Sequence, residues 1–429
     1  MFYGWVIVAL AFVAQFVVIG AFIQCFPVFL LPLSEEFGIG RGEASLPPVA
    51  LMLCGIVISP LVGQAVGRFP IRGVMLVGAL VMAIGFFGLS HATAYWQILV
   101  LYGLTGSFSL GALGVVSCNS LVVNWFERRR AMALGIAMIG MSISGAVLIP
   151  TATWALTLWG WRAVYQGFAW GALAMLPLIA GLVATRPSEM GLTPDGEAAF
   201  PEVDIAPTAP VLPATSARQL VTSPVLWLIA AACGLSYFGS AGIMNHGIAF
   251  AIDRGIDPMR GAVLLSAISI GAAFGKLLFG WLARPLGDRG SFGVAIACQL
   301  AGLLGLIAFE RYSPLVAATG LYGLGIGGIA PLQAALLARG FGTRNFGPVM
   351  GLIFPMMIPF QITGAPLAGL IFDSRGGYDL ALWIFLASTA ASALALALLR
   401  FPNHDAQPAQ PCPEPLPGSA ARSTSPTPG

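Results

Sequence analysis

The amino-acid sequence predicts an all-α integral membrane protein with twelve transmembrane helices. Hydrophobic residues make up 58% of the 429-residue chain and charged residues 9%, whereas a soluble domain carries about 25% charged residues. The apolar residues fall into twelve runs, each near the ~20 residues that a helix needs to cross a bilayer. Transmembrane strands are excluded because the runs are too long and do not alternate apolar with polar residues.

The runs predict two sets of six helices in chain order. The first set lies near residues 5–31, 44–66, 73–90, 96–123, 131–155 and 163–184. The second set lies near residues 224–250, 260–282, 291–309, 314–337, 348–372 and 380–400. Gly and Pro are scattered through both sets, as membrane helices allow. The first run has no basic segment before it and no small-residue cleavage site, so we interpret it as a retained anchor.

Two polar segments divide the chain into domains. We predict an N-terminal six-helix bundle at 1–184 and a C-terminal six-helix bundle at 224–400. Residues 185–223 contain six prolines and five acidic residues, too polar a composition to fold alone, and they predict a cytoplasmic linker. Residues 401–429 hold eight prolines with Ser, Thr and Ala, which predicts a disordered, Pro-rich cytoplasmic tail.

The two halves repeat short sequence elements at nearly one offset. LYGL occurs at 101–104 and again at 321–324, and Gly63 and Gly280 end the second and eighth predicted helices. A Gly-aromatic pair precedes both the sixth and the twelfth helix, at 160–161 and 377–378. These matches indicate a duplicated bundle, and parallel halves with a midplane site between them are typical of one large transporter architecture.

Basic residues are unevenly distributed between the predicted loops. If both termini are cytoplasmic, the inside segments carry thirteen arginines and the outside loops six, and membrane proteins concentrate Lys and Arg on the cytoplasmic side. The triplet Arg128, Arg129 and Arg130 adds most to this bias. We therefore predict a multi-pass protein of the inner (plasma) membrane with both termini cytoplasmic.

Lys276 is the only lysine of the chain, and it lies inside the apolar run that ends at Leu282. A cation at membrane depth costs at least about 2.5–3.5 kcal/mol, so such residues mark a substrate or ion path. None of the twelve runs contains an Asp or Glu to pair with it, which indicates that an anionic ligand is the counter-ion. The alternative is that the side chain snorkels to the headgroups about 9 Å away.

Three motifs carry a resemblance to a known family. Gly4-Trp5 opens the first helix, WFERRRAMALGIAMIG occupies 125–140, and DRGI follows the seventh helix at 253–256. With these motifs the chain resembles the major facilitator superfamily outside the linker and tail. Within it the chain is most similar to the monocarboxylate and oxalate–formate transporter group, whose signature joins an aromatic-Phe pair, basic residues and Ala-x-Gly-x-Ala-x-x-Gly. The resemblance implies the two-bundle fold of that superfamily and transport activity.

Small residues of the fifth helix suggest close packing. Gly135, Gly140 and Gly145 keep one side of this helix thin enough for contact with another helix.

The superfamily's loop motif after helices two and eight is altered in this chain. It is similar to Gly-x-Leu-Ala-Asp-Arg-x-Gly-Arg-Arg, whereas this chain has GQAVGRFPIR at 63–72 and GWLARPLGDR at 280–289. The aspartate that braces the cytoplasmic gate is replaced by Gly67 and by Arg284, so something else must hold the outward-open state. The candidate cytoplasmic gate or anchor residues are Arg68, Arg128, Arg129, Arg130 and Arg284.

The resemblance also assigns a role to Lys276. It falls where the group places an arginine, or sometimes a lysine, that pairs with the substrate carboxylate. Oxalate exchangers carry a second cation on helix eleven, but residues 348–372 contain no Lys, Arg or His. Animal monocarboxylate transporters have a lysine and an aspartate where this chain has Val28 and Ala272. One cation favours one carboxylate, and the two missing residues are a departure from the animal-type proton mechanism.

Helices one, four, seven and ten line the cavity in this architecture. Gln24, Asn245 and Gln333 are therefore candidate substrate-binding residues beside Lys276, and the alternative for each amide is an interhelical hydrogen bond. His246 titrates near neutrality and is, with Lys276, a candidate for proton coupling. The alternative is a neutral, hydrogen-bonded core histidine.

The predicted function is secondary active transport of a small organic anion, a monocarboxylate, by alternating access. Proton symport and anion exchange both stay open. We expect no enzyme activity, no cofactor and no metal site, because the sequence has no catalytic constellation, no Walker motif and no Cys/His cluster. One alternative is a transporter or exporter of a neutral or amphipathic compound, and another is a transporter-like sensor without transport. The expected partners are the anion and the lipid bilayer, not nucleic acid, and the chain is expected to be monomeric.

Overall fold

The computed structural model describes residues 2–126, 129–193 and 220–399, and almost all of them are helical. The elements up to residue 193 are α1 (Gly4–Ile19), the π-helix η1 (Gly20–Gln24), α2 (Phe26–Phe37), α3 (Arg41–Ala44), α4 (Leu46–Arg68), α5 (Ile71–Ser90), α6 (Tyr95–Leu113), α7 (Val115–Trp125), α8 (Arg130–Leu182) and the 3₁₀-helix η2 (Pro187–Met190). The elements from residue 220 on are α10 (Pro224–Asp253), α11 (Pro258–Ala308), α12 (Tyr312–Arg375) and α13 (Asp379–Leu398).

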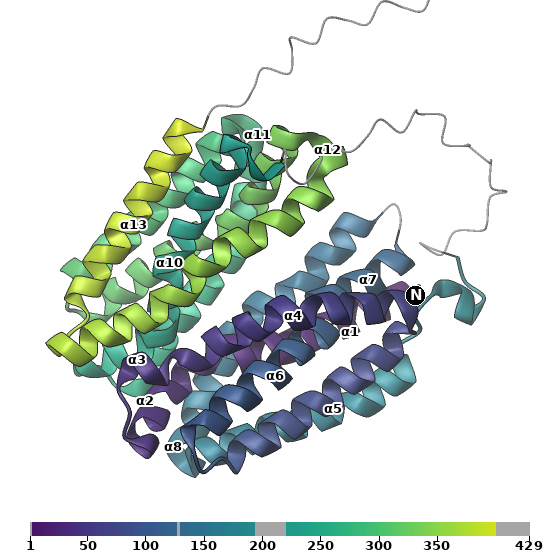
Figure 1. Ribbon diagram of the computed structural model, residues 1–429, viewed down its shortest axis with the longest axis horizontal. Coiled ribbons are helices and arrows are strands. Elements are labelled where there is room, and N and C mark those ends of the chain that lie inside the picture. Colours follow the sequence, from purple (N-terminus) through teal and green to yellow (C-terminus); the bar gives the residue numbers. More distant parts are fainter. Residues whose placement is uncertain (1, 127–128, 194–219, 400–429) are drawn as a thin grey trace, which may run out of the picture.

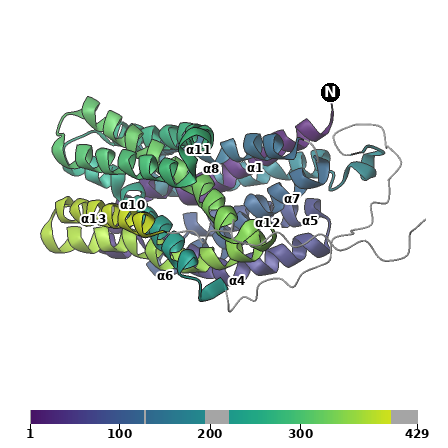
Figure 2. The ribbon, with the colours of Figure 1, turned by 90° about the horizontal axis from the view of Figure 1, so that it is seen from above.

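The helices form two groups. Figure 1 shows α1–α8 on one side of the molecule and α10–α13 on the other, and we call these the N-terminal and C-terminal helix groups. Most helices lie along the long horizontal axis in Figure 2. Most of the predicted linker and the whole predicted tail lie outside the described residues.

Ten helical segments of the described chain are long and apolar enough to cross a membrane. Two of them, within α8 and α11, have 51 residues each, about 76 Å at 1.5 Å per residue and more than twice the ~30 Å hydrocarbon core. Each contains one glycine in the left-handed region, Gly160 (φ 75°) and Gly287 (φ 69°). The chain turns back there because glycine adopts this conformation without steric cost, so each segment crosses twice.

The 64-residue helix α12 contains two more of these segments and also folds back. The Arg254 guanidinium donates to the carbonyl oxygens of Leu306 and Phe309 at 3.0 and 3.1 Å, and it lies 3.8 Å from the Asp379 carboxylate. Phe309 precedes the start of α12 and Asp379 follows its end, so both ends of α12 lie at one end of the molecule. The described residues thus supply the twelve predicted crossings, and the all-α membrane fold is confirmed.

The first crossing is interrupted near its middle. Pro27 has no N–H to donate to the carbonyl of Ile23 four residues earlier, and the helix widens into η1 before α2 begins. Such π-turns often lie at functional sites. Here η1 ends at Gln24, one of the predicted substrate-binding residues.

Two of the motif fragments meet in space. The rings of Trp5 and Phe126 have centroids 5.1 Å apart, and a Cβ at Gly4 would lie 2.9 Å from the Phe126 ring. Trp125 is fully buried and its Nε1 donates to the Ala184 carbonyl at 2.9 Å. These residues fasten the end of α7 to the start of α1 and to the end of α8, so this part of the signature has a structural role.

The glycines of α8 differ in what they contact. A Cβ at Gly140 would lie 2.5 Å from the Phe12 carbonyl oxygen of α1, and one at Gly145 would clash with Ser269 of α11. A Cβ at Gly135 would have no neighbour within 4 Å. The close packing expected of this face is present at Gly140 and Gly145, and the expectation is wrong for Gly135 because α8 faces open space there.

Candidate functional site

A cavity of about 190 Å³ lies between the two helix groups. It is lined from both sides, by η1 and α4 of the N-terminal group and by α10 and α12 of the C-terminal group. The lining residues are Phe22, Ile23, Gln24, Pro48, Val49, Leu51, Met52, Tyr237, Ser240, Ala241, Met244, Asn245, Gln361, Ile362 and Ala365. None of them is charged, and three of them carry amides.

Two of the predicted substrate-binding residues face this cavity. Gln24 donates its Nε2–H to the Met141 carbonyl at 3.4 Å, and Asn245 donates its Nδ2–H to the Ala241 carbonyl at 2.7 Å. Each amide keeps further hydrogen-bonding capacity, since an amide has two N–H donors and a carbonyl acceptor. Gln333 is buried, with 4% of its surface exposed, and it does not line the cavity.

Lys276 lies on α11 at the boundary between the helix groups. Its Nζ donates to Ser142 Oγ of α8 at 2.7 Å, and Ser142 is 5% exposed. Within the described residues no Asp or Glu forms an ion pair with Lys276. The ammonium therefore points toward the opposite helix group and is held there by a neutral hydroxyl.

The Lys276 pair is connected to the cavity through one turn of α8. Ser142 follows Met141, and the Met141 carbonyl accepts the hydrogen bond from Gln24, which lines the cavity. Neighbouring residues of a helix are 1.5 Å apart along its axis. Gln24 also lies against Gly145, one turn further along α8. Lys276 is thus not a lining residue of the cavity, and it is linked to the wall only through Ser142, Met141 and Gln24.

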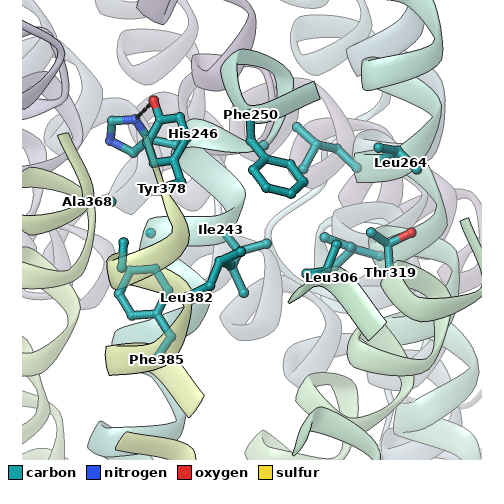
Figure 3. A pocket seen from close by; sticks show the side chains of 15 residues that line it. Ile243, His246, Phe250, Leu264, Leu306, Thr319, Ala368, Tyr378, Leu382 and Phe385 are labelled. Carbon is teal, nitrogen blue, oxygen red and sulfur yellow. Dashed lines mark hydrogen bonds between the residues drawn. The ribbon is translucent and has the colours of Figure 1, made fainter. Parts of the chain in front are cut away.

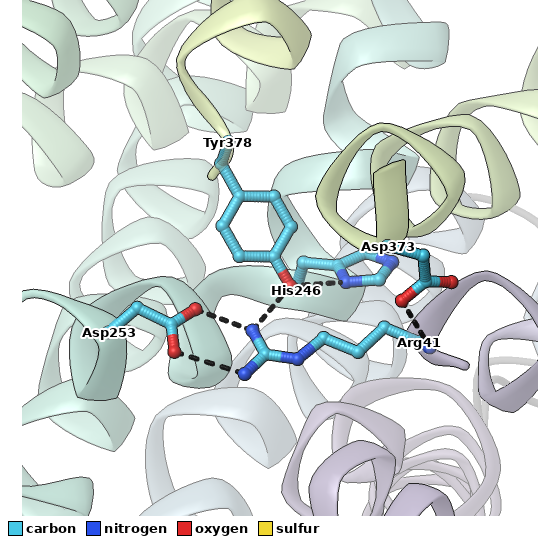
Figure 4. A network of polar contacts seen from close by, with 5 residues as sticks. All are labelled: Arg41, His246, Asp253, Asp373 and Tyr378. Carbon is cyan, nitrogen blue, oxygen red and sulfur yellow. Dashed lines mark hydrogen bonds and ion pairs between the residues drawn. The ribbon is translucent and has the colours of Figure 1, made fainter. Parts of the chain in front are cut away.

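A second polar cluster joins the helix groups at the end of the molecule that carries α3 (Figure 4). The Arg41 guanidinium contacts both carboxylate oxygens of Asp253 at 2.5 and 3.0 Å and donates to the Tyr378 hydroxyl at 3.0 Å. It also lies 3.6 Å from the centre of the Phe372 ring. One N-terminal arginine is therefore bound by three residues of the C-terminal group, and we call this end the Arg41 end.

Backbone contacts reinforce this closure. The N–H groups of Arg41 and Gly42 both donate to the Asp373 carboxylate at 2.9 Å. Gly42 and Gly369 approach so closely that a Cβ on Gly369 would overlap the Gly42 backbone. A side chain at either position would push α3 away from α12, so the two glycines permit the groups to meet.

His246 is joined to the Arg41 cluster, and its hydrogen bonds define its protonation. Its Nε2 lies 2.9 Å from the Ala365 carbonyl, which can only accept, so Nε2 carries the proton. Its Nδ1 lies 3.0 Å from the Tyr378 hydroxyl and accepts the phenolic proton, while the phenolic oxygen accepts from Arg41. Burial raises the pKa of Tyr378 to about 12, although Arg41 opposes this shift. The arrangement suits a neutral, 2% exposed imidazole.

A smaller pocket of about 30 Å³ lies inside the C-terminal group, with His246, Tyr378 and Phe385 on one side and Leu306 on the other (Figure 3). This volume is about that of one water molecule. The polar atoms of His246 and Tyr378 bond to each other, and the remaining wall is almost entirely apolar. The pocket is too small for an organic anion, so the cavity between the groups is the better candidate.

The predicted gate arginines whose side chains the structure describes, Arg68, Arg129 and Arg284, belong to neither cluster. Arg68 ends α4 and is exposed, Arg129 is exposed before α8, and Arg284 is exposed on α11. Arg128 and the side chain of Arg130 lie outside the described residues. No group of His, Cys, Asp and Glu within the described residues is arranged to hold a metal ion.

The sequence interpretation missed Arg41, Asp373, Tyr378 and Ser142. Asp253 was part of the DRGI motif but had no assigned partner. A charged residue beside the end of an apolar run was the available signal for Arg41 and Asp373. Which ends meet across the two helix groups depends on the tertiary structure, so this signal could not pair them.

The family assignment rests on most of the chain. The sequence profile of the Major Facilitator Superfamily matches residues 8–358. The chain belongs to this superfamily. It is therefore a multi-pass membrane transporter and not an enzyme.

Individual relatives differ in what their names report. The chain is 26% identical over 389 residues to monocarboxylate transporter 11 of Homo sapiens, covering 88% of this chain and 78% of the relative. It is 27% identical over 390 residues to monocarboxylate transporter 13 of Bos taurus, covering 88% and 84%. It is also 25% identical over 411 residues to the agnestins efflux protein AgnL12 of Paecilomyces divaricatus, covering 90% and 85%.

A solved structure supports the fold. The chain superposes with a TM-score of 0.69 and 13% identity on a bacterial homologue of the human lysosomal transporter Spinster in an inward-facing, unoccupied conformation. The match covers 93% of this chain and 95% of the other.

Proposed function

We propose that this protein is a secondary transporter of a small organic anion with one carboxylate, and that Lys276 binds that carboxylate during alternating access. The observation that carries the proposal is the position of the cation. Lys276 is the only lysine, it lies in an apolar run, and its hydrogen-bond partner among the described residues is a neutral serine of the opposite helix group. Such a cation is costly unless a negative charge reaches it.

Alternating access gives this position a function. The contacts of a residue at the boundary between the helix groups change when one group rocks against the other. A carboxylate bound to Lys276 can take the place of Ser142 as hydrogen-bond partner, so binding can act on the contact between α8 and α11. The names of the two monocarboxylate relatives support the same substrate class.

We further propose an inner-membrane orientation with both termini cytoplasmic, which makes the Arg41 end the outer end. The support is the thirteen-to-six distribution of arginines. Single cysteines at Ser188 and Glu35, in a chain whose native cysteines are serine, test it with an impermeant thiol reagent. Labelling of Ser188→Cys from the periplasm would refute the orientation.

Transport of labelled mono- and dicarboxylates into proteoliposomes tests the function. Lys276→Ala should abolish uptake of monocarboxylates and Lys276→Arg should keep part of it, because the carboxylate otherwise loses its water without gaining a partner. Arg260→Ala is the matched control, since it removes an exposed cation of the same helix. A folded Lys276→Ala protein with normal uptake would show that the lysine is structural.

One observation favours a second candidate. The cavity wall is uncharged and largely apolar, as a transporter of a neutral or amphipathic compound requires, and one relative is named as an efflux protein. In that case a neutral amphipathic compound should be transported, and Lys276→Ala should leave its transport unchanged.

A further inference from the structure

The cavity between the helix groups is larger and less polar than a minimal carboxylate needs. Its volume of about 190 Å³ exceeds the ~150 Å³ of an engineered apolar cavity that binds benzene. Most of its lining residues are apolar, among them Phe22, Leu51, Met52 and Met244. Formate, acetate or oxalate would leave most of this apolar surface uncovered.

The cavity wall also lacks a charge to bind a carboxylate. All fifteen lining residues are neutral, and an ionised carboxylate without a partner is strongly disfavoured in such an environment. Lys276 is the cation that the described contacts link to this wall, through Ser142, Met141 and Gln24. A ligand that uses both places must carry its charge at one end and its apolar part at the other.

The groups at each place fit the two ends of such a molecule. The Lys276 ammonium has three N–H donors, of which Ser142 takes one, so two remain for a carboxylate. Gln24 and Asn245 face the cavity and can bond a hydroxyl or carbonyl substituent. Apart from Tyr237, Ser240 and Gln361, the other lining residues are apolar and can contact a hydrocarbon tail.

We infer that the substrate is a monocarboxylate with an aromatic ring or a comparable apolar tail, bound with its carboxylate at Lys276 and Ser142 and its tail in the cavity. This inference rests on the proposed function for the carboxylate end. The placement of the apolar tail rests on the geometry of the residues that line the cavity. Each buried methylene should raise affinity about fourfold, so tail length and shape determine specificity.

Calorimetric binding to the full-length protein in nanodiscs tests the inference with acetate, oxalate, 3-phenylpropionate and the neutral 3-phenylpropanamide. We expect 3-phenylpropionate to bind at least tenfold more tightly than acetate or oxalate. Val49→Phe fills the cavity from α4 and should weaken 3-phenylpropionate at least tenfold while leaving acetate unchanged. Val77→Phe is the matched control, because Val77 is half exposed on α5 and does not line the cavity.

The outcomes distinguish a failure of the tail subsite from a failure of the proposed function. Equal affinity for acetate and 3-phenylpropionate in the wild-type protein would overturn the inference, even if Val49→Phe does not fold. If Lys276→Ala then still abolishes acetate binding, the proposed function stands without the tail subsite. If the neutral amide binds as well as the acid in both the wild-type protein and Lys276→Ala, the carboxylate assignment is wrong, and so is the inference.

Discussion

Replacing Arg41 by alanine should open the Arg41 end of the transporter, which is the outer end in the proposed orientation. Arg41→Ala removes the paired hydrogen bonds to Asp253, the hydrogen bond to Tyr378 and the contact with the Phe372 ring. It keeps the backbone N–H groups that bind Asp373. Because these partners belong to the opposite helix group, their loss destabilises the closed outer end and not one group alone.

The magnitude follows from the exposure of the pair. The Arg41 and Asp253 side chains are 15% and 30% exposed, so their ion pair lies between exposed pairs, which contribute about 0–1 kcal/mol, and buried pairs, where losing one partner costs about 3–5 kcal/mol. A value of about 1–2 kcal/mol is reasonable after solvent screening. The Tyr378 hydrogen bond and the Phe372 contact add about 0.5–1 kcal/mol each. The sum is about 2–4 kcal/mol, and its lower bound of about 2 kcal/mol corresponds to about a 30-fold shift in the equilibrium.

Labelling of a cavity cysteine from the outer side measures this shift. In a chain with its native cysteines replaced, Met52→Cys places a thiol in the cavity wall, and an impermeant reagent reaches it only when the outer end opens. Arg41→Ala should raise the labelling rate at least about 30-fold, and Arg41→Lys should have an intermediate effect because it lacks the planar fork.

The control is Arg260→Ala, which removes a cation stacked on Tyr312 of its own helix group. It should leave the labelling rate unchanged. A folded Arg41→Ala protein labelled within twofold of the wild-type rate would refute the assignment of this cluster as a gate.

Three further predictions concern pH, packing and coupling. The folded-state pKa of Tyr378 is raised from 10 to about 12, so folding favours the protonated phenol. The loss of Tm in Tyr378→Phe should therefore be constant from pH 6 to 9 and should shrink as pH rises from about 10 to 12. A loss of Tm that grows at high pH would contradict this prediction. Gly140→Ala should destabilise the protein by about 1–3 kcal/mol in thermal or denaturant unfolding, because the added methyl meets the α1 backbone. Gly135→Ala should be neutral or slightly stabilising, because no neighbour lies near its added methyl. Equal effects of the two substitutions would argue against the contact between α8 and α1. If a proton enters with the anion, calorimetry in buffers of different ionisation enthalpy should show proton uptake on binding. Lys276→Gln should reduce this uptake more than His246→Gln does, since both ring nitrogens of neutral His246 already have hydrogen-bond partners. No proton uptake between about pH 5 and 8 would favour anion exchange.

The helices themselves were predictable to within a few residues at most ends. Length and apolarity determine a membrane crossing, because every backbone polar group in lipid must be bonded within its own helix. Local departures from regular helix inside the crossings were harder to predict from the sequence. The π-turn at residues 20–24 and the positive φ of Gly160 and Gly287 depend on local geometry, although Pro27 was a visible signal for the first.

The candidate site was predictable in part. Gln24 and Asn245 face the cavity as expected for helices one and seven, whereas Gln333 does not. His246 is buried in a hydrogen-bonded network, and the sequence offered that interpretation beside proton coupling. Its link to Arg41 runs through Tyr378, which is 132 positions from His246 and 337 positions from Arg41, and no local pattern contains that information.

The amino-acid sequence alone determined the membrane class, the number of crossings, the superfamily resemblance and the isolation of Lys276, because these follow from composition, run length and motif spacing. Only the tertiary structure decided which faces meet. Lipid tails are as apolar as the side chains of a neighbouring helix, so hydrophobicity does not distinguish a packed face from a lipid-facing one. The contact of Lys276 with Ser142, the closure around Arg41 and the uncharged cavity between the groups all depend on that choice of faces.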